Sequence, residues 1–206
     1  MRVAIFGASG KTGGLLVDRA LAKGYEVTVL VRNASKFKKE GVRVVTGDAT
    51  KLDDVLHTVR GQDAVIDAIG GSTPYKTTLL ESTSVRNMID AMQAEGVRRL
   101  VVISMMGIGD SRTQAPFWYK HLLMPTFLRG STKDKILMEE EVIKSGLNYV
   151  IARPPILKDD RPTGGATVIR TNTTGHTITR ADLADFLVDQ LTADDYLGRA
   201  VTVVNT

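Results

Sequence analysis

The sequence of 206 residues contains no cysteine. Disulfide bonds, thiolate metal sites and cysteine nucleophiles are therefore excluded. Aromatic residues are scarce, at 5% of the chain, and there is a single tryptophan. No apolar stretch reaches the length of about 20 residues that a membrane-spanning helix needs. No signal-peptide pattern precedes the first apolar segment. These absences favour a cytoplasmic protein with no membrane span.

The composition that remains is typical of a globular protein. Hydrophobic residues make up 43% and charged residues 24% of the chain, which is enough to bury a core. The length predicts a single domain over residues 1–206. The net charge is only +4, and no basic stripe accompanies it, so small anionic molecules are favoured as ligands over nucleic acid.

The most informative stretch lies at the start, where an apolar run over residues 3–6 meets glycines 7, 10 and 13 and a helical pattern follows. This order of strand, glycine turn and helix is typical of dinucleotide-binding proteins. Gly7 would make the tight turn, Gly10 would let the backbone approach a pyrophosphate, and Gly13 would let the helix pack on the strand. Free N–H groups at the helix N-terminus would bind the phosphates. A plain strand-turn is the weaker alternative.

Strand-like and helix-like patterns alternate along the rest of the chain. This alternation predicts an α/β fold of the Rossmann type, with a doubly wound, mainly parallel sheet and helices on both faces. Thr179 is expected to cap the last helix. The expected strands cover 26–31, 41–46, 63–69, 99–104, 148–152 and 201–204, the expected helices cover 15–22, 52–59, 78–95, 133–145 and 180–191, and a hairpin-like segment covers 167–178.

Arg32 stands at the end of the second expected strand, where folds that bind NAD place an acidic residue for the ribose 2′-hydroxyl. A basic residue there suits the 2′-phosphate of NADP, and Lys36 follows nearby. The alternative is a solvated basic loop. Asp48 and Ala49 end the third strand, where the carboxylate could meet the adenine amino group or could only cap a turn.

Two further segments are expected beside the cofactor. The fourth strand ends in Ala68, Ile69, Gly70 and Gly71, next to the first glycine turn, where open α/β sheets bind ligands. This segment is assigned to the nicotinamide ribose. After the sixth strand, residues 154–156 (Pro154, Pro155, Ile156) form an extended backbone that cannot pair as sheet and is expected along the nicotinamide face.

Residues 105–131 interrupt the alternation with a long segment that begins at the carboxyl end of the fifth strand. Loops of this length in compact domains are more often functional than accidental. An apolar and basic lid over a flat, anionic ring system is one interpretation. A satellite core, a dimer interface and contact with a membrane surface are the alternatives. His121 has no metal-ligand spacing around it, so no metal site is expected.

Taken together, residues 7–13, 24–32, 61–66 and 145–150, with Pro154-Pro155, resemble the flavin reductase and biliverdin-IXβ reductase group. These are atypical short-chain dehydrogenases with NmrA-like architecture. The resemblance implies an NADPH-dependent reductase of flavins, tetrapyrroles or quinone-like acceptors. By position, the resemblance implies that the phosphates are contacted by the glycine turn, at Gly7, Ser9, Gly10, Lys11 and Thr12. It implies a contact of Arg32 with the 2′-phosphate and contacts of Asp48 and Ala49 with the adenine. The ribose would be contacted by Ile69, Gly70 and Gly71.

The chain departs from this group at the groups that could donate a proton. Short-chain dehydrogenases use a Tyr-x-x-x-Lys pair, of which the lysine has a counterpart in Lys135 but the tyrosine has none. The serine after the fifth strand falls on Met105, with Ser104 one residue earlier, and the histidine after the two prolines is Ile156. Ser104 and Lys135 are therefore the candidate catalytic residues, expected to orient the nicotinamide ribose and the substrate.

A conjugated ring can accept a hydride while water supplies the proton, whereas a carbonyl needs a donor for its developing alkoxide. The predicted function is thus an NADPH-dependent reductase, with FMN, FAD or a related ring as a loosely bound substrate. Met105, Met106 and Trp118 are expected to wall the substrate site; core packing is the alternative for both methionines. The competing hypothesis is a non-enzymatic NADPH-binding sensor or scaffold. The protein is expected to be a monomer or a weak homodimer.

Overall fold

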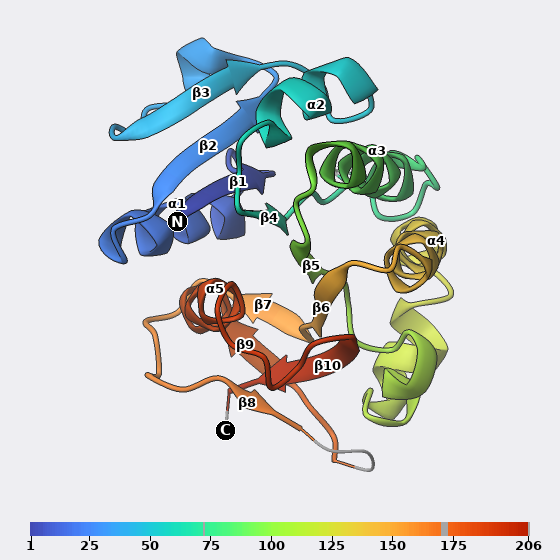
Figure 1. Cartoon of the computed structure of the whole chain (residues 1–206). Coiled ribbons are helices and arrows are strands. Elements are labelled where there is room, and N and C mark those ends of the chain that lie inside the picture. The colour runs from blue at the N-terminus through green and yellow to red at the C-terminus, as the bar shows by residue number, and fades with distance from the viewer. Residues whose placement is uncertain (72, 170–172, 206) are drawn as a thin grey trace.

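The structure is a computed structural model that describes residues 1–71, 73–169 and 173–205. An eight-stranded sheet in the order β3-β2-β1-β4-β5-β6-β10-β8 forms the middle of the molecule (Figure 1). Every pair in it is parallel except β10 with β8. The strands are β1 (Arg2–Phe6), β2 (Glu26–Val31), β3 (Val42–Thr46), β4 (Ala64–Asp67), β5 (Arg99–Ile103), β6 (Asn148–Arg153), β8 (Thr167–Val168) and β10 (Arg199–Val204).

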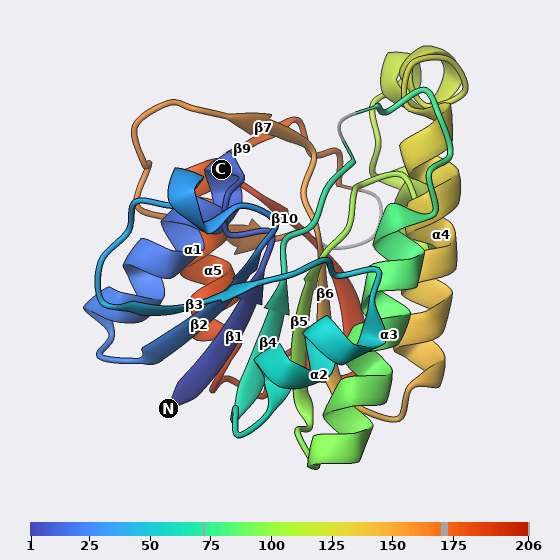
Figure 2. The same ribbon diagram turned by 90° about the horizontal axis from the view of Figure 1, so that it is seen from above.

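Helices cover both faces of this sheet (Figures 1 and 2). Val3 and Ile5 of β1 pack into the core under α1 and α5, while Ala4 and Phe6 point into the core under α2, α3 and α4. Because both faces are buried, the central strands read as continuous apolar runs. The helices are α1 (Lys11–Ala22), α2 (Leu52–Val59), α3 (Leu80–Glu95), α4 (Arg129–Lys144) and α5 (Arg180–Asp189).

The predicted doubly wound α/β fold is confirmed. The chain winds from β1 outward to β2 and β3, then crosses back so that β4 pairs with the other edge of β1. The loops after β1 and β4 therefore lie at the point where the winding changes direction, and ligands of such sheets bind there.

The expected hairpin over 167–178 is wrong. β8 pairs antiparallel with β10, whereas β9 (Thr177–Thr179) pairs in parallel with β7 (Ile156–Lys158) in a separate small sheet. Residues 170–172 of that segment lie outside the described part of the chain. The expected cap on α5 is confirmed, because the Asp182 amide donates to Thr179 Oγ1 at 3.0 Å.

Residues 105–131 form a small folded unit in place of an open loop. Two short helical elements, η2 (Gly109–Thr113) and η3 (Tyr119–Leu123), lie within it. Met105, Met106 and Tyr119 are buried together there. The satellite core, one of the alternatives raised by the sequence, is therefore present.

Candidate functional site

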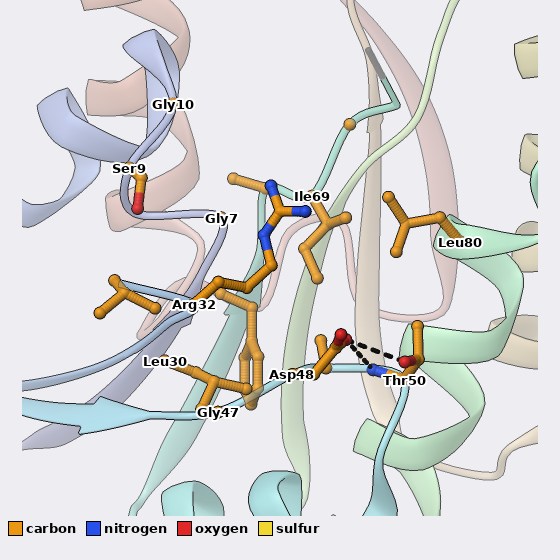
Figure 3. Close-up of a pocket in the computed structure, with 15 residues that line it drawn as sticks. Gly7, Ser9, Gly10, Leu30, Arg32, Gly47, Asp48, Thr50, Ile69 and Leu80 are labelled. Carbon is orange, nitrogen blue, oxygen red and sulfur yellow. Dashed lines mark hydrogen bonds between the residues drawn. The ribbon is translucent and has the colours of Figure 1, made fainter. Parts of the chain in front are cut away.

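A cavity of about 360 Å³ opens at the carboxyl ends of β1, β2 and β4 (Figure 3). The glycine turn after β1 forms one wall, and the segments after β3 and β4 form the others. Its lining includes many of the residues predicted from the sequence: Gly7, Ser9, Gly10, Arg32, Asp48, Ala49, Ala68, Ile69 and Gly70.

The glycines of the first turn are required by close approaches of the backbone. Gly7 has a φ of +78°, and a Cβ atom there would lie 2.4 Å from the carbonyl oxygen of Ala68. A Cβ on Gly13 would lie 2.1 Å from the Gly7 oxygen, so α1 packs on the turn only with glycine there. A Cβ on Gly10 would meet only the Gly7 oxygen, at 3.3 Å, which leaves its outer side open to a ligand.

The N-terminus of α1 is suited to an anion. Gly10 is the N-cap, and in the described part of the chain no side chain caps it and no acidic residue lies in the first turn. The free N–H groups and the helix dipole therefore both favour negative charge at this end. Together with the close-packed glycines, this arrangement fits the pyrophosphate of a dinucleotide.

Arg32 follows β2, and its guanidinium lies between the glycine turn and Ile69, across the cavity (Figure 3). Its side chain is exposed, and no carboxylate among the described residues lies within ion-pairing distance. The guanidinium is thus a cation available to a phosphate group at the cavity.

Asp48 is held in place by its own loop. Its Oδ1 atom accepts hydrogen bonds from the backbone N–H and the hydroxyl of Thr50, at 2.9 and 2.8 Å (Figure 3). These bonds, with the nearby charge of Arg32 in support, lower the pKa of Asp48. A carboxylate that accepts hydrogen bonds is a suitable partner for the amino group of adenine, which donates them.

The cavity also has walls that sequence reasoning missed. Leu30 and Val31 come from the end of β2, and Leu80 comes from the start of α3. Gly47 and Thr50 flank Asp48. The position of Gly47 and Thr50 beside the predicted Asp48 is a signal that could have found them, whereas Leu80 lies 32 positions away in sequence and carried none.

Several predicted residues lie outside this cavity. The ammonium group of Lys11 pairs with Asp159, while Thr12 and Gly13 lie in the first turn of α1. The Gly71 amide donates to Glu81 Oε1 at 3.3 Å. The side chain of Lys36 lies outside what the structure describes.

The two candidate catalytic residues are both buried and bonded to other protein groups. Ser104, just after β5, donates its hydroxyl proton to Glu139 of α4. Glu139 in turn accepts two hydrogen bonds from Arg153, at 3.0 and 2.7 Å. The Glu139 carboxylate is thus shared between the serine hydroxyl and a buried guanidinium.

Lys135 is bonded in a second network. Its ammonium group donates to the Ile103 carbonyl at 3.0 Å and pairs with Glu81 at 3.2 Å. Glu81 also accepts from Gly71, so the network connects α4 to the segment after β4. These two contacts use two of the three N–H groups of Lys135.

Asp67, at the end of β4, is a third buried group of this region. Its Oδ1 accepts from the Ile69 amide at 2.9 Å, and its Oδ2 has no partner among the described residues. Burial raises the pKa of Asp67 to about 7. The bond to Ile69 fixes the backbone that lines the cavity.

The residues predicted to wall the substrate site differ in their exposure. Met106 is 1% exposed and Met105 is also buried, so both pack in the satellite core. Trp118 is half-exposed, with its ring edge on Tyr119. Pro154 and Pro155 are buried between β6 and β7, where the Pro154 carbonyl accepts from Met106, and the exposed Ile156 begins β7.

A family model described as NAD(P)H-binding matches residues 7–194, which span the glycine turn, the cavity and α5. This chain belongs to the NAD(P)H-binding family. It is thus an NAD(P)H-binding, oxidoreductase-like protein, and the glycine turn with the free α1 N-terminus is where its structure suits that cofactor. In residues 1–71, 73–169 and 173–205, histidine and acidic side chains form no group of three or more that could hold a metal ion.

Two relatives of this NAD(P)H-binding protein show how far the similarity extends along each chain. An uncharacterised chloroplastic protein of Arabidopsis thaliana is 30% identical over 98% of this chain and 76% of its own length. The photosystem II assembly factor Ycf39 of Guillardia theta is 30% identical over 72% of this chain, which spans 44% of that relative.

A similar solved structure is that of ChuY, described as an anaerobilin reductase from Escherichia coli O157:H7. It is 27% identical, covers 99% of this chain and 97% of its own, and superposes with a TM-score of 0.82. No helix in the described part of the NAD(P)H-binding protein has the length and apolar character to cross a membrane.

Proposed function

We propose that this protein is an NADPH-dependent reductase that transfers a hydride to a flavin (FMN, FAD or riboflavin) or to a related conjugated ring such as biliverdin or a quinone. The observation that carries the proposal is the bonding of Ser104 and Lys135. The hydroxyl proton of Ser104 is directed to Glu139, and two of the three N–H groups of Lys135 are directed to Ile103 and Glu81.

This bonding favours ring acceptors over ordinary ketones. A ketone reduced by hydride develops an alkoxide that needs a donor within reach. A flavin spreads the added negative charge over its ring system and can take its proton from water. The balanced reaction is NADPH + FMN + H⁺ → NADP⁺ + FMNH₂.

In this reaction the chain's own residues would bind the cofactor, orient it and exclude water. When bound, the reduced nicotinamide supplies the hydride. Ser104 keeps oxygen lone pairs as acceptors for a ligand N–H or O–H group, while Glu139 fixes the direction of its proton. Lys135 holds the end of β5 and, through Glu81, the segment at Gly71, so that the cofactor would be oriented before the acceptor arrives.

The preference for NADPH rests on Arg32. It occupies the place where an acidic residue would select NAD, and its charge faces the cavity (Figure 3). A dianionic 2′-phosphate suits this guanidinium, whereas the 2′-hydroxyl of NADH gains little from it. The similarity to a structure described as an anaerobilin reductase supports a tetrapyrrole or other large conjugated ring among the acceptors.

The test is anaerobic turnover. The protein is mixed with NADPH and, in turn, FMN, FAD, riboflavin, biliverdin, menadione and a set of aldehydes and ketones, and the loss of NADPH absorbance is followed. We expect turnover with at least one ring acceptor and none with the carbonyl compounds. Turnover confined to carbonyl compounds would refute the proposed acceptor class.

A second candidate function is a non-enzymatic NADPH-binding sensor or scaffold. The observation that favours it is the likeness to Ycf39, which bears the name of a photosystem II assembly factor, over 72% of this chain. The same experiment separates the two functions. Tight NADPH binding with no oxidation by any acceptor would favour the sensor.

A further inference from the structure

The satellite unit carries an unusual exposed apolar surface, which we call the apolar tip and define as residues 117–127. Phe117 is 75% exposed, Leu122 65%, Phe127 54% and Trp118 48%. The small core of the satellite unit is formed by other residues, such as Met106 and Tyr119.

The stretch of chain that contains the apolar tip carries charge of one sign, and the nearby Asp110 is paired with Arg153. No aspartate or glutamate occurs from residue 111 to residue 133, while Arg112, Lys120, Arg129 and Lys133 fall in that stretch. A further base comes from the segment before α3, because Arg129 Nε donates to the carbonyl of Tyr75, next to Lys76. Tyr75 itself is 47% exposed. Exposed aromatic and aliphatic groups among basic side chains complement a surface that has an anionic outer layer and an apolar interior.

The shape of this region favours a flat partner. The short helical segment that precedes α4 and contains η3 stands beyond the rest of the molecule in Figure 2. A projecting tip inserts into a surface and does not enclose a peptide. A second copy is a poor partner, because a two-fold contact would place the same basic surface of both copies face to face.

We propose that the apolar tip docks this protein on an anionic lipid bilayer. Phe117, Trp118, Leu122 and Phe127 enter the interface between headgroups and acyl chains, and the bases contact the anionic headgroups. Aromatic side chains favour that interface, and each basic residue near an anionic leaflet strengthens binding. The inference is independent of the proposed reductase activity, because the docking requires neither cofactor nor acceptor.

The single tryptophan of the chain lies in the apolar tip and reports on docking directly. The full chain is mixed with vesicles of phosphatidylcholine, or of phosphatidylcholine and phosphatidylglycerol in equal parts. We expect co-sedimentation with the anionic vesicles, a blue shift of Trp118 emission and its quenching by brominated acyl chains. Binding should weaken as salt rises, because salt screens the headgroup charge.

Two variant pairs test the assignment while Trp118 stays as the probe. Leu122→Ser with Phe127→Ser, and Lys120→Glu with Arg129→Glu, should each lower vesicle affinity roughly tenfold or more. The matched controls are Ile143→Ser, an exposed apolar residue at the other end of α4, and Lys144→Glu beside it. Both controls should bind vesicles like the unchanged chain.

Three results would overturn the proposal. One is no binding to anionic vesicles at low salt, and another is equal binding by the tip variants and the unchanged chain when circular dichroism shows both folded. The third is a dimer in sedimentation velocity that Leu122→Ser with Phe127→Ser dissociates, because the tip would then be covered by a second copy.

Discussion

Arg32 sets the cofactor preference in this account, and its removal has a calculable effect. A charge-assisted hydrogen bond contributes about 1.5–3 kcal/mol, but Arg32 is exposed, so solvent screening reduces the figure to about 1–2 kcal/mol. Arg32→Ala should therefore weaken NADPH binding roughly 5- to 30-fold. Arg32→Glu also adds repulsion of the 2′-phosphate, so its loss should be larger.

The assay is a titration of NADPH and NADH, followed by calorimetry or by nicotinamide fluorescence. NADH affinity should change little in Arg32→Ala, because NADH has no 2′-phosphate. Arg43→Ala is the matched control, since Arg43 is an exposed base on β3 that lines a different hollow. Equal losses for the two cofactors, or an equal loss in Arg43→Ala, would refute the role of Arg32.

Three further predictions concern the pair of Glu139 with Arg153, the buried Asp67 and the glycine turn. Glu139→Gln removes the buried carboxylate that pairs with Arg153 and leaves that guanidinium only the exposed Asp110, so denaturant unfolding should show a loss of up to about 3 kcal/mol. Asp67 holds a proton in the folded state up to about pH 7 but in the unfolded chain only to about pH 4, so the stability it contributes is present at low pH and is lost as pH rises through 7. The free energy of unfolding of Asp67→Asn should therefore exceed that of the unchanged chain at pH 8, by roughly a few kcal/mol, and by less at pH 5. Gly10→Ala should keep the melting temperature and weaken NADPH binding, whereas Gly13→Ala should lower the melting temperature, because its Cβ would overlap the Gly7 carbonyl.

Each of these predictions has a result that would contradict it. An unchanged unfolding midpoint in Glu139→Gln would show that the pair with Arg153 adds nothing to stability. A pH-independent difference between Asp67→Asn and the unchanged chain would show that Asp67 titrates normally. Unchanged NADPH affinity in Gly10→Ala would move the pyrophosphate away from the glycine turn.

The order of strands and helices could be predicted because it depends on local pattern. The expected bounds of β2 and α2 match the structure, since each is a short periodic run with clear ends. The glycine turn could also be predicted, because the spacing of Gly7, Gly10 and Gly13 reflects close approaches of the backbone that favour glycine.

The start of α4 could not be predicted because distant residues decide it. α4 begins at Arg129, four residues before the expected start, although Gly130 disfavours a helix. The amides of Gly130 and Ser131 both donate to the carbonyl of Pro74, at 2.9 Å each. A Cβ on Gly130 would lie 2.2 Å from the Lys76 backbone, so this crossing also requires glycine.

The surroundings of the candidate catalytic residues were hidden for the same reason. Ser104 and Glu139 are 35 positions apart, and Glu139 and Arg153 are 14 apart, so no local pattern joins them. Likewise, the partners of β8 and β9 lie in other parts of the chain, and the segment therefore resembled a hairpin.

The most direct test of the central claim is transfer of the hydride itself. The protein is mixed with NADPH carrying deuterium at C4 of the nicotinamide, in separate samples for each face, and with a 5-deazaflavin, whose C5–H bond does not exchange with water. Mass spectrometry of the deazaflavin should show one deuterium gained from one of the two samples only. Binding of NADPH without deuterium transfer to the deazaflavin from either sample would contradict the proposed function.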